Sequence, residues 1–126
     1  MLKILVVDDE LDVKDLFQQR FRREIRNAEF QLDFANSGEE ALSYLKGHSS
    51  EVILILSDIN MPGMSGFELL RHIRQDFKAP PSPVVMMITA YGDPDSQKQA
   101  VDLGANDFLT KPLDFAVLKQ KLREVA

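Results

Sequence analysis

The chain has 126 residues, 44% of them hydrophobic and 28% charged, and its 20 acidic and 15 basic side chains give a formal charge of −5. This composition is typical of one folded globular domain, here residues 1–126; its acidic balance argues against direct nucleic-acid binding, and the absence of cysteine excludes disulfides, thiolate metal sites and cysteine nucleophiles. The apolar runs are too short to span a membrane and the start does not resemble a signal peptide, so we expect a cytoplasmic protein.

Apolar residues along the chain alternate between two spacings, one typical of strands and one typical of helices. Taken in chain order, the predicted elements are a strand over 2–7, a helix over 11–25, a strand over 30–35, a helix over 37–47, a strand over 52–56, a helix over 67–77, a strand over 84–88, a helix over 93–104, a strand over 107–110 and a helix over 115–125. Ser37 and Glu40 form a capping box at one helix start, and Asp93 followed by Pro94 marks another.

Five strand–helix units in strict alternation are typical of an α/β domain with a parallel sheet. Right-handed connections between the strands place helices on both faces, which gives a doubly wound, five-stranded architecture. In such sheets ligands bind outside the carboxyl ends of the strands, near the point where the strand order reverses. The residues that directly follow the predicted strands are therefore the candidates for chemistry.

Charged and polar side chains follow four of the five predicted strands. Asp8 and Asp9 follow the first strand, Asp58 the third, Thr89 the fourth and Lys111 the fifth. Taken singly, each has an ordinary explanation as a helix cap, a turn residue or a solvated side chain. Because all of them stand at strand ends, we predict that they converge on one rim of the sheet.

The predicted rim carries three carboxylates and one ammonium group. Clustered carboxylates either hold a proton or bind a hard cation, and a donor set of oxygens favours Mg²⁺ or Mn²⁺ over zinc. A carboxylate beside such an ion is a plausible phosphoryl acceptor, because the metal offsets the repulsion between the nucleophile and the incoming phosphate. A lysine and a hydroxyl group can hold the oxygens of the transferred group.

Four motifs carry a family resemblance over essentially the whole chain. They are Ile4-Leu-Val-Val-Asp8-Asp9, Leu56-Ser-Asp58-Ile-Asn-Met-Pro-Gly63, Ile88-Thr89-Ala90, and Lys111-Pro112 preceded by Phe108. In this order and spacing the sequence resembles a response-regulator receiver domain of two-component signalling, of the kind found in chemotaxis regulators. The resemblance implies a flavodoxin-like (βα)5 fold with strand order 2-1-3-4-5.

The resemblance also implies roles for the acidic residues. Asp58 would be the phosphoacceptor. Asp9 and Asp58 would bind Mg²⁺ directly, together with the backbone carbonyl of Asn60. Asp8 would act on the metal mainly through a bound water molecule.

Further roles implied by the resemblance concern phosphoryl binding and switching. Lys111 would pair with Asp58 or its phosphoryl group, with Ala90 beside it. Thr89 would turn inward on phosphorylation and Phe108 would rotate with it. The bond between Lys111 and Pro112 would be cis, which is far less costly before proline than elsewhere.

The partner implied by the resemblance is a sensor histidine kinase or a histidine phosphotransfer protein, which would supply the phosphoryl group from phosphohistidine. The domain would be a signalling switch that dephosphorylates itself, and not a turnover enzyme. Its readout surface would be the fourth predicted helix, the fifth strand and the last helix, a surface that also allows a homodimer. Both a stand-alone regulator and a receiver with a fused or separate output domain fit the chain, with no membrane partner.

Two other protein classes share features of this sequence. A haloacid-dehalogenase-like phosphatase uses a strand-end aspartate and Mg²⁺, but it needs a second aspartate two residues later. That position holds Asn60 after Asp58, and Glu10 after Asp8. A flavodoxin-type cofactor module needs a loop rich in glycine and hydroxyl groups after the first strand, where the acidic residues 8–10 would repel phosphate.

One basic run is not absorbed by these functions. Arg20, Arg22, Arg23 and Arg26 fall late in the predicted helix over 11–25. Cations near a helix C-terminus are favoured by the helix dipole, which makes a solvated surface the first interpretation. A docking surface for an acidic partner is the alternative.

Overall fold

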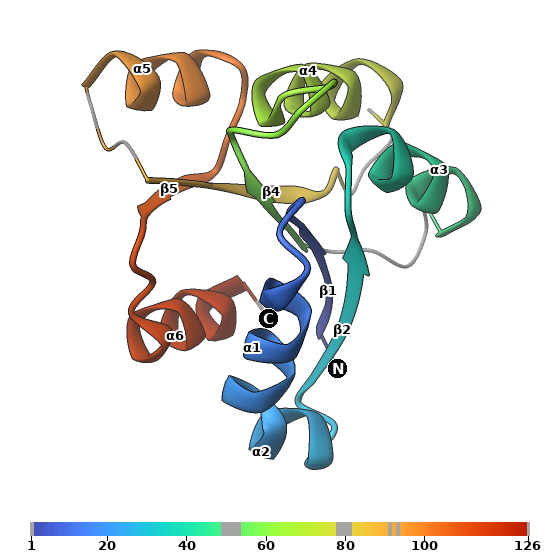
Figure 1. Cartoon of the computed structure of the whole chain (residues 1–126), viewed down its shortest axis with the longest axis vertical. Coiled ribbons are helices and arrows are strands. Elements are labelled where there is room, and N and C mark those ends of the chain that lie inside the picture. Colours follow the sequence, from blue (N-terminus) through green and yellow to red (C-terminus); the bar gives the residue numbers. More distant parts are fainter. Residues whose placement is uncertain (1, 49–53, 78–81, 91, 93, 126) are drawn as a thin grey trace.

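A computed structural model describes residues 2–48, 54–77, 82–90, 92 and 94–125, and these residues form a five-stranded parallel sheet with helices on both faces (Figure 1). The strand order is β2-β1-β3-β4-β5, so the predicted fold class and order are confirmed. The strands are β1 (Leu2–Val7), β2 (Phe30–Ala35), β3 (Leu54–Asp58), β4 (Val84–Thr89) and β5 (Asp107–Thr110). The part of the predicted strand over 52–56 that precedes residue 54 lies outside the described residues.

The described helices lie on both faces of the sheet, three on each face. Figure 1 shows the two groups on opposite sides of the strands. One face carries α1 (Asp12–Arg20), α2 (Arg22–Arg26) and α6 (Phe115–Val125). The other face carries α3 (Gly38–His48), α4 (Gly66–Asp76) and α5 (Pro94–Asp102). Because successive side chains of a strand point to opposite faces, the sheet contributes to two separate hydrophobic cores.

Local capping agrees with the sequence where the structure describes it. The Ser37 hydroxyl accepts a hydrogen bond of 3.0 Å from the Glu40 amide, as a capping box requires. Ser65 caps α4 by accepting from the Glu68 amide at 3.2 Å, and Asp114 caps α6. The predicted cap at Asp93 lies outside the described residues.

The single helix predicted over 11–25 is wrong. Leu11 precedes α1, and the chain breaks at Phe21, which has φ −102° and ψ 12°, before it resumes as α2. The apolar spacing across the break also predicts the wrong buried residue. Ile25 is 39% exposed, whereas its neighbour Glu24 is only 6% exposed. The break keeps Phe21 fully buried, stacked on Phe17 with a centroid distance of 5.7 Å.

Glu24 is buried because α6 supplies its counter-charges. Its carboxylate lies 3.0 Å from the Lys119 ammonium and 3.6 Å from the Arg123 guanidinium. Burial alone would raise the pKa of Glu24, but the hydrogen bond and charge of Lys119, with a contribution from Arg123, lower the pKa overall. Arg123 also bonds Glu29 at 2.7 Å, so these ion pairs join α2 and the segment before β2 to α6.

No helix among the described residues is both long and apolar enough to cross a membrane.

Candidate functional site

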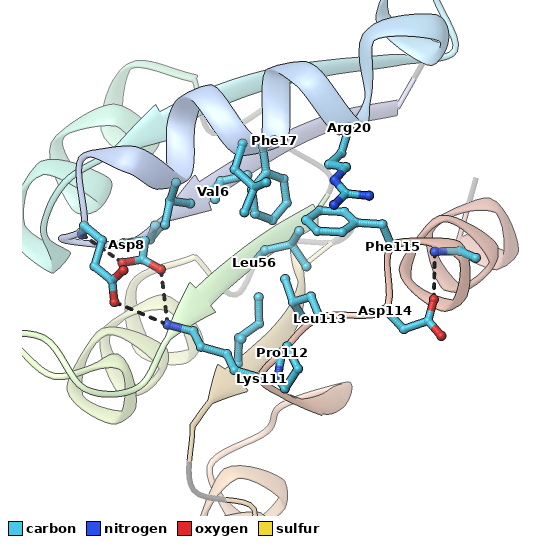
Figure 2. Close-up of a pocket in the computed structure, with 16 residues that line it drawn as sticks. Val6, Asp8, Phe17, Arg20, Leu56, Lys111, Pro112, Leu113, Asp114 and Phe115 are labelled. Atoms are coloured by element: carbon cyan, nitrogen blue, oxygen red, sulfur yellow. Dashed lines mark hydrogen bonds and ion pairs between the residues drawn. The ribbon is translucent and has the colours of Figure 1, made fainter.

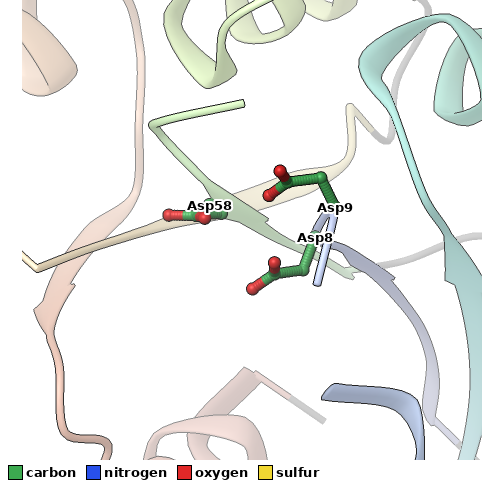
Figure 3. A group of neighbouring side chains, drawn as sticks. All are labelled: Asp8, Asp9 and Asp58. Carbon is green, nitrogen blue, oxygen red and sulfur yellow. The ribbon is translucent and has the colours of Figure 1, made fainter. Parts of the chain in front are cut away.

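The three predicted carboxylates lie together at the carboxyl ends of two neighbouring strands. Asp8 directly follows β1, Asp9 comes next, and Asp58 is the last residue of β3. Carboxylate oxygens of all three lie within 4.8 Å of one another, and Figure 3 shows the side chains facing a common space. Parallel pairing of β1 with β3 brings these residues together although about fifty positions separate them in the sequence.

Backbone contacts hold the ends of these strands in place. The Asp8 amide donates to the carbonyl of Ala35 at 3.1 Å, and the Ile59 amide donates to the carbonyl of Ile88 at 3.0 Å. Gly66 begins α4 directly against β3: a Cβ atom at this position would lie 2.2 Å from the Asp58 carbonyl oxygen. A glycine is therefore required for α4 to start where it does.

Lys111 reaches the carboxylates from the end of β5 (Figure 2). Its ammonium lies 3.5 Å from Asp58 Oδ2, 3.6 Å from Asp8 Oδ2 and 3.9 Å from Glu10 Oε1. The contact with Glu10 was not foreseen from the sequence. The acidic residue directly after the aspartate pair was the available signal, since it continues a run of negative charge at the same strand end.

Burial, with a smaller contribution from neighbouring carboxylates, raises the pKa of two of the aspartates, Asp58 and Asp8. Burial and then the Asp8 carboxylate raise the pKa of Asp58, and Lys111 offsets this only in part. Burial likewise raises the pKa of Asp8, against the opposing effects of the Glu10 amide and Lys111. For Lys111, burial alone would lower the pKa, but the carboxylates of Asp58, Asp8 and Glu10 raise it overall.

Asp8 and Asp9 differ in how their oxygens are engaged. Asp8 Oδ1 accepts a hydrogen bond of 2.9 Å from the Glu10 amide, and Oδ2 faces Lys111. Asp9 is more exposed, and no group in the described part of the chain hydrogen bonds or pairs with its carboxylate. The Asp9 oxygens are thus available to an external cation, whereas those of Asp8 already have partners.

The other predicted residues lie at or just beyond the ends of β3, β4 and β5, except Phe108, which lies within β5. Thr89 ends β4, is 1% exposed, and its carbonyl accepts from the Lys111 amide at 2.8 Å. Ala90 and Asn60 are exposed, each just beyond a strand end. Phe108 lies in β5 opposite Met87 and packs, half-buried, against the core beneath α3, α4 and α5, away from the carboxylates. The peptide bond between Lys111 and Pro112 is cis.

An apolar pocket adjoins the acidic cluster, which sequence reasoning missed. It has a volume of about 670 Å³ and lies between α1 and α6 (Figure 2). Phe17, Leu56 and Phe115 are among its apolar walls, and Asp8 and Lys111 stand at its polar end. No local pattern signals such a pocket, because its walls come from segments far apart in the sequence.

The arrangement can perform two kinds of chemistry. Three carboxylates that offer only oxygen ligands, with no histidine or cysteine in the group, match the donor set that hard divalent cations prefer. A buried carboxylate with a neighbouring ammonium can also act as a nucleophile toward an anionic group, since the ammonium can bind the oxygens of that group.

Sequence comparisons agree with this chemistry. The response regulator receiver domain family matches residues 4–123 of the chain. The chain is 36% identical over 129 residues to the chemotaxis protein CheY of Pseudomonas aeruginosa. This match covers 98% of this chain and 95% of that protein. It is 33% identical over 122 residues to the response regulator RppA of a Synechocystis strain, covering 97% of this chain. It spans about half of RppA, 49% of its length.

The fold comparison gives the same result. A chain of the CheX–CheY–BeF3–Mg²⁺ complex from Borrelia burgdorferi superposes with a TM-score of 0.85 at 33% identity. The match covers 98% of this chain and 88% of that chain. The sheet order and the placement of helices on both faces are thus shared with a solved chain whose complex contains Mg²⁺.

Proposed function

The chain belongs to the response regulator receiver domain family of two-component signalling, and on that premise we propose that Asp58 is its phosphoacceptor. The observation that carries the proposal is the placement of Asp58 at the end of β3, 3.5 Å from Lys111 and beside the other two carboxylates. Residues 1–126 then form one receiver domain. A receiver is a switch and not a turnover enzyme, which disfavours the dehalogenase-like phosphatase considered from the sequence.

The phosphoryl donor is a phosphohistidine of a sensor histidine kinase or of a histidine phosphotransfer protein. A carboxylate oxygen of Asp58 attacks the phosphorus atom, the phosphorus–nitrogen bond breaks, and the ring nitrogen of the donor histidine takes the electron pair. Lys111 binds the oxygens of the transferred group, and we assign Ala90, exposed just beyond β4, to the same oxygens. Attack by water later releases phosphate and restores the carboxylate.

A divalent cation fits the acidic cluster, because its three carboxylates converge and because burial raises the pKa of Asp58 and Asp8, so that a nearby positive charge would favour their ionised forms. We assign Mg²⁺ to Asp9 and Asp58 with the backbone carbonyl of Asn60, and place Asp8 in contact through water. Bound there, the cation would offset the repulsion between Asp58 and the incoming phosphate. Mn²⁺ has the same preference for oxygen ligands.

Labelling with acetyl phosphate tests this proposal directly. In the presence of Mg²⁺, the protein is expected to gain one phosphoryl group, and peptide mapping by mass spectrometry should place it on Asp58. A chelator of divalent cations should reduce labelling to the background of heat-denatured protein. A phosphoryl group on another residue, or labelling that survives the chelator, would contradict the assignment.

Signal transmission is assigned to Thr89 and Phe108. A phosphoryl group on Asp58 adds negative charge and acceptor oxygens, toward which the Thr89 hydroxyl can donate. Movement of Thr89 changes the packing next to β5 and allows Phe108 to rotate. The surface of α5, β5 and α6 then changes, and this surface is where an output domain, fused or separate, or a second copy would detect the state.

Substitution of Thr89 with alanine is expected to uncouple phosphorylation from this surface. Asp58 should still be phosphorylated, but the amide NMR shifts of α5, β5 and α6 should lose most of their response. One or two charge-assisted hydrogen bonds of roughly 1.5–3 kcal/mol correspond to a population shift of about 10- to 100-fold, and this is the shift that the variant should lack. Thr110→Ala, at the exposed position paired with Thr89 across β4 and β5, is the matched control. Parent-like shifts in Thr89→Ala would rule out the coupling.

A further inference from the structure

Four exposed arginines form a patch at the junction of α1 and α2, which we call the arginine patch: Arg20, Arg22, Arg23 and Arg26. They are four of the seven arginines in the chain. Together with Gln19, Glu24 and Lys119 they line a hollow of about 490 Å³. The patch therefore concentrates positive charge on one surface of a protein whose formal charge is −5.

The arginine patch has no carboxylate of its own. Within the described part of the chain, none of the four guanidinium groups forms an ion pair, and Arg20 alone has a ring contact, 5.4 Å from the centroid of Phe115. The neighbouring cations differ: Lys119 is paired with Glu24, and Arg123 with Glu24 and Glu29. Glu24 thus pairs with cations of α6, whereas no carboxylate among the described residues pairs with the four arginines of the patch.

The helix dipole accounts for only part of the arginine patch: Arg20 ends α1 and Arg26 ends α2, where cations are favoured, but Arg22 stands at the start of α2. A continuous helix over 11–25 would have placed them near a C-terminus, where cations are favoured. The chain instead breaks at Phe21, and Arg22 begins the short helix α2, the end where the dipole disfavours positive charge. Like-charged residues at Arg22 and Arg26, one helical turn apart, also repel each other.

We propose that the arginine patch is a docking surface for an acidic polypeptide segment of a partner protein. The planar guanidinium group binds carboxylates through two parallel hydrogen bonds, and arginine is enriched in protein interfaces where lysine is depleted. The guanidinium groups of the patch are therefore suited to bind the side-chain carboxylates of an acidic segment.

The shape and lining of the hollow favour a polypeptide over a small anion. Metabolite pockets are mostly apolar with a few polar groups, whereas every residue lining this hollow is charged or polar. Lys119, the other cation that lines the hollow, is paired with the buried carboxylate of Glu24 and so is engaged by a protein group rather than by a phosphate. A segment lying across the rim contacts the arginines without approaching Glu24.

The location of the arginine patch leaves the phosphorylation site accessible. Helix α2 precedes the amino end of β2, whereas Asp8 and Asp58 stand at the carboxyl ends of the parallel strands, so the two sites are at opposite ends of the sheet (Figure 1). A partner held at the patch can therefore remain bound while a phosphodonor reaches Asp58.

Fluorescence anisotropy with a fluorescein-labelled oligoglutamate peptide tests the proposal on the intact chain. The parent protein is expected to bind the peptide, and the triple variant Arg22→Gln, Arg23→Gln, Arg26→Gln to bind about 10-fold more weakly, the sum of three modest surface ion pairs. The matched control is Lys46→Gln, Arg71→Gln, Lys98→Gln, which removes the same charge from exposed residues elsewhere. Both variants should retain the circular dichroism and acetyl phosphate labelling of the parent.

Several results would overturn the proposal. Equal affinity of the parent and the patch variant would do so, as would an equal loss in the control variant, which would reduce the effect to net charge. Tripolyphosphate binding that is tighter than the peptide and depends on the patch would identify a small-anion site instead. Sedimentation with phosphatidylglycerol vesicles, dependent on the patch and without peptide binding, would identify a membrane surface.

Discussion

Asp58→Asn is expected to abolish phosphorylation by acetyl phosphate while making the metal-free protein more stable. The amide cannot attack phosphorus, so labelling measured by mass spectrometry should fall to background. The raised pKa of Asp58 means that folding disfavours its charged form at neutral pH. Removing that charge beside Asp8 should therefore increase the free energy of unfolding, measured in urea with a chelator present.

The paired measurements separate a lost nucleophile from a damaged fold. Asp107→Asn removes a carboxylate from β5 that pairs with Lys121 at 2.8 Å, away from the site, and should be labelled as the parent is. Residual labelling of Asp58→Asn at the parent's level would refute the phosphoacceptor assignment. Lower stability of Asp58→Asn would show instead that Lys111 stabilises the carboxylate more than burial and Asp8 destabilise it.

Asp9→Ala is expected to weaken Mg²⁺ binding far more than Asp8→Ala. Asp9 offers a carboxylate without a partner among the described residues, whereas both oxygens of Asp8 face protein groups. We expect a loss of about 10-fold for Asp8→Ala, the lower end of what changes outside the inner ligand shell cause, and of about 100-fold or more for Asp9→Ala. Isothermal titration calorimetry with MgCl₂ measures both.

Asp102→Ala serves as the control for net charge, since this exposed residue ends α5, the helix that runs back from the carboxyl end of β4. Its affinity for Mg²⁺ should stay within about twofold of the parent, because exposed charges interact weakly through water. Equal affinities for the Asp8 and Asp9 variants would remove the distinction between direct and water-mediated contact.

Two kinds of feature were predictable from the sequence: those formed by residues close together in the chain, and those that follow from the order and direction of the strands. The cap formed by Ser37 and Glu40 involves positions three apart, so no distant segment can alter it. The convergence of Asp8, Asp9 and Asp58 follows from parallel strands, whose carboxyl ends must share one edge of the sheet. Alternating strand and helix patterns were enough to place that edge.

The missed features depend on contacts between distant segments. Periodicity favoured Ile25 for the core, yet Glu24 is buried there because Lys119 and Arg123, on the last helix, neutralise it. The break at Phe21 also involves α6, since Phe17 before the break and Phe21 at the break both pack on Phe115. Local spacing carries no information about which charges α6 will present to α2.

The close contact at Gly66 joins the backbone of β3, the strand that ends at Asp58, directly to the backbone of α4. The carbonyl of Asp58 lies where a side chain at position 66 would begin, and the Gly66 amide bonds the carbonyl of Ile59 at 2.8 Å. Because the two backbones are in direct contact, we expect a displacement at the end of β3 to move the first turn of α4 as well. A structural change at Asp58 would then reach α4 through this backbone contact, and no charged residue of α4 would be needed to transmit it.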